Sequence, residues 1–147
     1  FLHCFQLAED WAPEAVNKAK KAIQGKPFDF QHAISCATEV AQKMGASEKE
    51  MVMVAGFAGG LGLSGSGCGA LSAALWMNAL SWCREHKTGS GTEDPKAEEL
   101  MRAFKDFTDE KYLCKDISQT QFDSVKEHTQ YIKNGGCREL IEELSEV

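Results

Sequence analysis

The chain has 147 residues, six of them cysteine, and a formal net charge of -6. A chain of this length can bury an ordinary apolar core, so its cysteines are not needed to staple the fold. Because acidic side chains are in excess, the chain lacks the positive surface potential that attracts a phosphate backbone. This argues against nucleic acid as a partner. The cysteines therefore indicate a metal or cluster site, redox chemistry or disulfides.

One long segment resembles a membrane span in its composition. Residues 51–83 contain no Asp, Glu, Lys or Arg. Their middle, GGLGLSGSG at 59–67, would leave irregular backbone in lipid, and each apolar half is shorter than the roughly 20 residues that a span requires. We expect two buried helices that meet at a loop, and no membrane span. No signal peptide is visible, which favours a cytoplasmic location.

The first half of the chain has the period of amphipathic helices. Apolar residues recur at spacings of three and four over 7–23 and over 29–44. The capping box Ser47-Glu-Lys-Glu50 predicts a helix beginning at residue 48, although MVMV at 51–54 would also suit a short strand. Trp11, Trp76 and Trp82 keep the helical spacing, so we expect them in the core.

Cys68 opens the most apolar part of the chain. The run from Cys68 to Cys83 is apolar nearly all round, which is typical of a central helix surrounded by other elements. Asp94 and Pro95 supply an N-cap and a first-turn proline for a further helix. A loop follows at 118–123, a helix at 125–133, and a last helix beginning at Cys137. We predict one all-α domain, residues 1–147, built as a helical bundle around the central helix that starts near Cys68.

The glycine-rich loop contains a nucleotide-binding pattern that its context does not support. Gly60 to Gly65 reads G-x-G-x-x-G between an apolar run and a helix. A Rossmann unit needs several parallel strands, and nothing after this helix resembles one, so we expect no nucleotide. The glycines instead permit positive φ and close approach, and they place Cys68 at a helix N-terminus, where the dipole favours the thiolate. The structural alternative is a small buried cysteine packed on a glycine turn.

The remaining cysteines are dispersed. No two lie within four positions of each other, so thioredoxin-type and zinc-knuckle C-x-x-C motifs are absent. Cys83 would lie about 22 Å from Cys68 along one helix, too far to share a metal or a disulfide. We expect Cys83 and Cys4 to be core residues. Four cysteines remain, each on a different predicted element: Cys36, Cys68, Cys114 and Cys137.

The segments around these four cysteines are HAISCATEVA, GFAGGLGLSGSGCGALSAAL, FKDFTDEKYLCKDI and NGGCRELIEEL. In this order and composition the chain resembles the C_GCAxxG_C_C family of small proteins to which redox activity is attributed. The resemblance covers nearly the whole chain after the first helix. It departs from the pattern where the second glycine is Ala73, a small-for-small replacement. The resemblance implies four functional cysteines and redox activity. Such activity needs an electron-transfer or thiol partner, which the sequence does not identify.

Two classes of function follow. In the first, Cys36, Cys68, Cys114 and Cys137 converge as ligands of an iron-sulfur cluster, zinc or another thiophilic metal, or as redox-exchanging thiols. Cys68 would be the catalytic thiol if a single nucleophile carries the reaction. In the second, the chain is a non-catalytic interaction domain with structural cysteines or disulfides. His32 could support Cys36 one turn away but is better explained as a surface residue, and His128 has no evident partner.

Overall fold

The computed structural model describes residues 2–23, 34–87, 91 and 93–147, and every regular element in these ranges is a helix. The first four are α1 (Leu2–Ile23), α2 (Cys36–Lys43), α3 (Glu48–Ala55) and α4 (Ala58–Leu61). They are followed by α5 (Gly69–His86), α6 (Pro95–Thr108), α7 (Cys114–Ser118), α8 (Val125–Lys133) and α9 (Arg138–Glu146). The predicted all-α fold class is confirmed.

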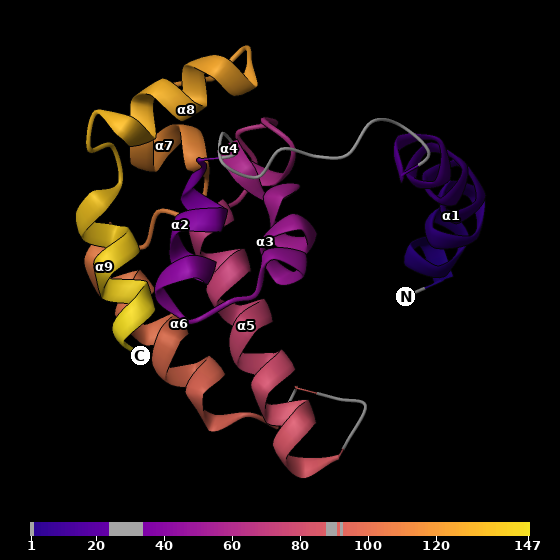
Figure 1. Ribbon diagram of the computed structural model, residues 1–147, viewed down its shortest axis with the longest axis horizontal. Helices are drawn as coiled ribbons and strands as arrows, with labels where there is room; N and C mark the ends of the chain where they lie inside the picture. The colour runs from indigo at the N-terminus through magenta and orange to yellow at the C-terminus, as the bar shows by residue number, and fades with distance from the viewer. Residues whose placement is uncertain (1, 24–33, 88–90, 92) are drawn as a thin grey trace.

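Helix α5 occupies the centre of the bundle formed by α2 to α9 (Figure 1) and contacts α2, α4, α6 and α9. It begins one residue after Cys68, which is its N-cap, as the sequence predicts. Ala70, Ala73 and Ala74 have almost no exposed surface. These short side chains let the neighbouring helices approach closely, so the alanine at position 73 suits a crowded helix contact.

Cap residues determine two of the helix starts. The Ser47 hydroxyl accepts a hydrogen bond from the Glu50 amide at 3.4 Å, and the Glu50 carboxylate accepts one from the Ser47 amide at 2.7 Å. MVMV is therefore helical and not a strand. Helix α2 has its own capping box at Ser35 and begins at Cys36. The predicted helix start near residue 29 is therefore wrong for residues 34 and 35, which are not helical. Residues 29–33, which include His32, lie outside the described residues.

Later helices begin as predicted. The Asp94 carboxylate accepts a hydrogen bond from the Lys96 amide at 3.0 Å, and Pro95 is the first residue of α6. Leu100 and Phe104 of α6 are fully buried. Helices α8 and α9 also occupy the predicted segments, so local signals fix most element boundaries in this half of the chain.

The helix predicted over 7–23 is confirmed within α1, but the expectation that its tryptophan and cysteine lie in the core is wrong. Trp11 is 64% exposed, and Cys4 is also exposed, whereas Trp76 and Trp82 are partly buried. Figure 1 shows α1 apart from α2 to α9. An amphipathic period indicates which face of a helix can be buried, but it does not supply the neighbour that buries it.

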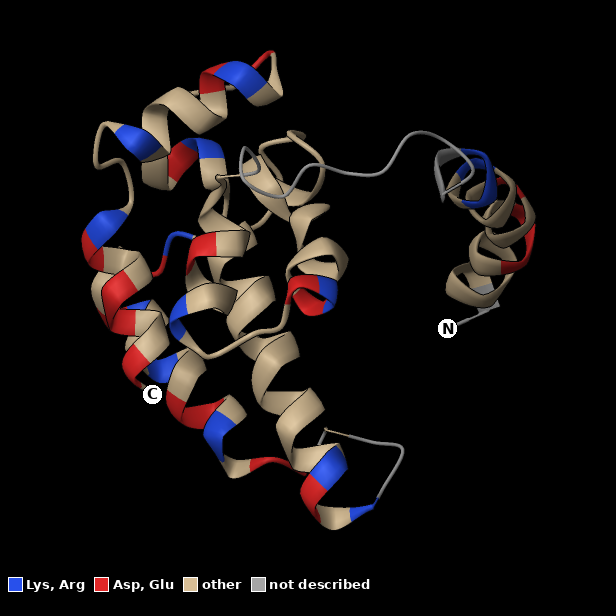
Figure 2. Ribbon diagram, viewed as in Figure 1, with Lys and Arg blue, Asp and Glu red and all other residues tan. Residues whose placement is uncertain are grey.

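Charged residues follow the outside of the bundle. Figure 2 shows Lys, Arg, Asp and Glu on the outer helices, whereas α5 carries charge only in its last turns. Among the described helices, none combines the length and apolar character that crossing a bilayer would demand.

Candidate functional site

The four predicted cysteines meet at helix N-termini. Cys36 and Cys114 are the first residues of α2 and α7, whereas Cys68 and Cys137 are the N-caps of α5 and α9. All four side chains line one small cavity of about 10 Å³. Segments up to 101 positions apart therefore contribute to a single cysteine cavity.

Glycines in the loop and at the start of α5 make room for two of these cysteines. A Cβ at Gly69 would collide with the Phe57 carbonyl oxygen and lie 3.3 Å from Cys36 Sγ. A Cβ at Gly60, which has a φ of +81°, would lie 2.8 Å from Cys114 Cβ. The absence of a side chain at these positions permits the close approach predicted for the loop.

A backbone hydrogen bond holds the start of α7 against the same loop. The Cys114 amide donates to the Gly67 carbonyl at 3.1 Å. Gly67 itself has a φ of +97°, a conformation that side chains disfavour. The loop therefore fixes both the α5 and the α7 cysteine, Cys68 and Cys114.

Burial controls the protonation of the two innermost thiols. It raises the pKa of Cys36 to about 12 and the pKa of Cys68 to about 11. A backbone hydrogen bond from Gly59 opposes this for Cys36, and bonds from Ala70 and Leu71 oppose it for Cys68. The expectation that the helix N-terminus makes Cys68 a thiolate is therefore wrong, because loss of solvation outweighs the amides.

The other two thiols are shifted in the same direction. Burial raises the pKa of Cys114, with the charge of Cys137 as a further cause, and burial also raises the pKa of Cys137. A thiolate at one position disfavours a second negative charge nearby. The cysteines are all free, and the four at the cavity are protonated thiols at neutral pH.

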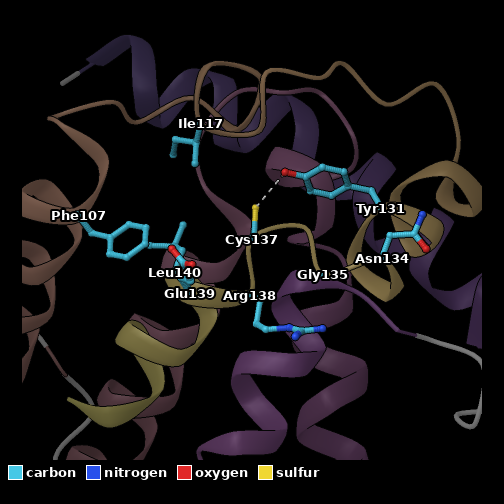
Figure 3. A pocket seen from close by; sticks show the side chains of 9 residues that line it. All are labelled: Phe107, Ile117, Tyr131, Asn134, Gly135, Cys137, Arg138, Glu139 and Leu140. Carbon is cyan, nitrogen blue, oxygen red and sulfur yellow. Dashed lines mark hydrogen bonds between the residues drawn. The ribbon is translucent and has the colours of Figure 1, made fainter.

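Cys137 is the outermost of the four. It is half-buried, whereas the other three are buried, and it has a φ of +57°. Figure 3 shows the Tyr131 hydroxyl directed at Cys137 Sγ, at 3.8 Å. A Cβ at Gly136 would collide with the Tyr131 ring, so this glycine makes room for the contact. Cys137 and Tyr131 also line an open pocket of about 440 Å³, which connects this edge of the site to the surface.

Among the residues of the cavity wall that sequence reasoning missed are His128 and Tyr131. Both are on α8, and the Phe122 ring lies 5.0 Å from the His128 ring and 5.1 Å from the Tyr131 ring. Their spacing of three places them on one helix face. No local signal connects that face with cysteines in other segments. Cys4 and Cys83 do not line the cavity.

The four side chains have the chemistry of metal ligands, but their spacing does not form a metal site. Four thiolates are the ligand set of many zinc and iron-sulfur sites. In the parts of the chain that the structure describes, however, no group of three His, Cys, Asp or Glu side chains is arranged to hold a metal ion. A cavity of about 10 Å³ has room for about one water-sized occupant. The donor types fit a thiophilic metal, but the present spacing does not.

These features define a small helical protein with a buried four-cysteine site. The chain belongs to the C_GCAxxG_C_C family, described as “Putative redox-active protein (C_GCAxxG_C_C)”, whose family model matches residues 31–147. The resemblance seen in the cysteine segments is thus confirmed, and helix α1 lies outside the matched part. No curated protein and no solved structure matches the chain.

Proposed function

We propose that Cys36, Cys68, Cys114 and Cys137 form a thiol-based redox centre. The observation that carries this proposal is that all four side chains line one cavity although they come from four separate helices. On oxidation, two thiols lose their S–H bonds and form one S–S bond. This releases two protons and two electrons to an acceptor. The family description supports redox activity in general.

The surroundings of the sulfurs suit reversible oxidation of two thiols to one disulfide. Raised pKa values keep Cys36 and Cys68 protonated at neutral pH, which protects them from indiscriminate reaction, since the thiolate is the reactive form. Cys137 lies at the open edge of the site and is the thiol that small reagents reach first.

The test is a count of free thiols after treatment with diamide, a small disulfide-forming oxidant. We expect Cys4→Ser/Cys83→Ser protein to lose two of its four thiols per chain and to recover them with dithiothreitol. Serine replacements at the four cavity positions, made one at a time in this background, identify the reacting pair. If all four thiols survive diamide in the folded protein, the cysteines are structural and the proposal fails.

A metal or iron-sulfur centre on the same four residues is the second candidate. It is favoured by the backbone hydrogen bonds that Gly59 makes to Cys36 and that Ala70 and Leu71 make to Cys68, because such bonds stabilise bound thiolates. Binding would require the sulfurs to rearrange. Iron, zinc and acid-labile sulfide measured in anaerobically purified protein decide between the candidates. Stoichiometric metal that is lost on serine replacement of any one of the four cysteines would favour this one.

The catalytic role proposed for Cys68 alone makes a different prediction. If Cys68 is a single nucleophile, Cys68→Ser abolishes thiol reactivity toward a substrate while Cys36→Ser, Cys114→Ser and Cys137→Ser leave it intact. A shared centre predicts that at least two of these replacements are damaging.

A further inference from the structure

A second pocket adjoins the cysteine cavity, and His128 lines both. This pocket has a volume of about 350 Å³, and Ser35, the residue before Cys36, forms part of its wall. Most of the remaining wall is apolar or glycine: Ile34, Ala55, Gly56, Ala58, Gly62, Leu63 and Val125. None of the described lining residues is an Asp, Glu, Lys or Arg, so the pocket suits a neutral, mainly apolar ligand.

His128 is the polar residue that this pocket shares with the cysteine cavity. Its side chain is only 2% exposed, and burial lowers its pKa, so the ring is neutral at pH 7. Among the described residues the ring nitrogens have no hydrogen-bond partner; the ring meets only the edge-on contact of Phe122. A ligand that accepts a hydrogen bond from the neutral imidazole would give this polar group a partner inside the pocket.

The other two polar side chains that line the pocket, Ser35 and Thr129, already make hydrogen bonds; the Ser35 hydroxyl accepts one from the Thr38 amide at 3.2 Å. The Thr129 hydroxyl donates a hydrogen bond to the Ile34 carbonyl at 2.9 Å. The His128 ring lies beside the glycine loop, where a Cβ at Gly59 would be in ordinary contact with the imidazole Cδ2 at 3.6 Å. His128 is therefore the donor available to a ligand at the end of the pocket nearest the cysteines.

We infer that this pocket, the His128 pocket, binds a quinone-type electron acceptor. A quinone is neutral, has an apolar ring, and carries a carbonyl oxygen that can accept a hydrogen bond from His128. It also matches the thiol chemistry: two thiols and one quinone give one disulfide and one hydroquinone. The S–S bond forms as two S–H bonds break, and both electrons and both protons end on the quinone.

This inference rests on the proposed redox centre and names the acceptor that the centre serves. An apolar ligand without a carbonyl would fill the pocket but leave His128 without a partner. A charged disulfide would lack a counter-charge among the described lining residues. The apolar wall, the buried donor and the adjoining thiols together favour the quinone class.

The experiment measures anaerobic oxidation of the reduced Cys4→Ser/Cys83→Ser protein by duroquinone. Every ring position of this quinone is substituted, so it does not add readily to thiols. We expect one quinone consumed for every two thiols lost. In the same background, His128→Leu removes the donor and Val125→Asp places a charge at the rim, where Val125 is 71% exposed. Each should slow this reaction about tenfold, because a hydrogen bond or apolar contact is lost.

Three controls make the result specific. His128→Gln keeps a donor and should retain most of the rate, whereas Val52→Asp places the same charge on an exposed residue that does not line the pocket and should change nothing. Diamide should oxidise the folded Val125→Asp and Val52→Asp variants at the parent rate, and the duroquinone rate of each His128 variant is compared with its own diamide rate, because His128 also lines the cysteine cavity. If diamide fails on the parent protein, the redox centre itself is wrong. If diamide succeeds but duroquinone does not, or oxidises Val125→Asp as fast as the parent, the quinone inference is overturned.

Discussion

Burial governs the chemistry of the four thiols at the scale of single residues. The sequence places Cys68 at a helix N-terminus, which taken alone predicts a lowered pKa. In the folded chain the pKa of Cys68 is instead raised to about 11, because the surrounding helices remove water from the sulfur. Tertiary burial is not encoded by neighbouring residues, so this sign could not be predicted locally.

The raised pKa values predict how the redox potential varies with pH. The Cys36 and Cys68 thiols stay protonated until about pH 11, so forming a disulfide from them releases two protons for two electrons. The midpoint potential should then fall by about 59 mV per pH unit from neutral pH to about pH 10. Equilibration with dithiothreitol buffers measures this slope. A slope that flattens near pH 7 would mean that a thiolate is already present.

Tyr131 should tune the reactivity of Cys137. Its hydroxyl lowers the pKa of Cys137, partly opposing the effect of burial. Tyr131→Phe removes that hydrogen bond, so alkylation of Cys137 by iodoacetamide at pH 8 should slow by about twofold to fivefold. Peptide mass spectrometry follows the rate at this one residue. Tyr112→Phe is the matched control, because Tyr112 is 42% exposed and does not line the cysteine cavity; equal slowing in both variants would refute the role of Tyr131.

At the scale of elements, helix caps could be predicted from the sequence, whereas contacts between helices could not. The Ser47 capping box and the Asp94-Pro95 start are formed by residues a few positions apart, and both were predicted. The exposure of Trp11 and the position of His128 depend on which helices meet. The family pattern of the cysteines supplied the long-range information that periodicity lacks.

Gly69, the first residue of α5, gives a test at this scale. Gly69→Ala should destabilise the protein by about 2 kcal/mol or more, because its methyl group would meet the Phe57 carbonyl oxygen and press on Cys36. Gly56→Ala is the matched control: Gly56 has a φ of -65°, and a Cβ there would meet nothing within 4 Å. Urea unfolding compares the two. Similar midpoints for both variants would show that the start of α5 tolerates bulk and that Gly69 is not needed to hold the site together.

At the scale of the whole molecule, the helix packing that brings the four cysteines together also removes their side chains from water. The cysteines at four helix starts, which lie far apart in the sequence, line one cavity beside the glycine loop. The small residues along α5 make this arrangement possible, since larger side chains would separate the helices. Buried thiols are the consequence, and they affect the stability of the fold.

The stability of the reduced, metal-free protein should fall above pH 9. Cysteine ionises near pH 9.0 in the unfolded chain, whereas the folded pKa values of Cys36 and Cys68 are about 12 and 11. Below pH 9 both states hold these protons. Above it only the folded state does, so the free energy of unfolding falls by up to about 1.4 kcal/mol per pH unit for each thiol, until the folded pKa is reached. In urea titrations Cys36→Ala should show a shallower decline than the parent protein; an equal decline would contradict the assigned burial.

The most direct test of the central claim is the location of the disulfide in oxidised protein. After mild oxidation of the wild-type chain, alkylation of the remaining thiols and proteolysis, mass spectrometry should find one intramolecular disulfide, with both partners among Cys36, Cys68, Cys114 and Cys137. Cys83 should be recovered alkylated. Disulfides formed only through Cys4 or Cys83, with the four cavity cysteines still reduced, would contradict a redox centre at the convergence of the helices.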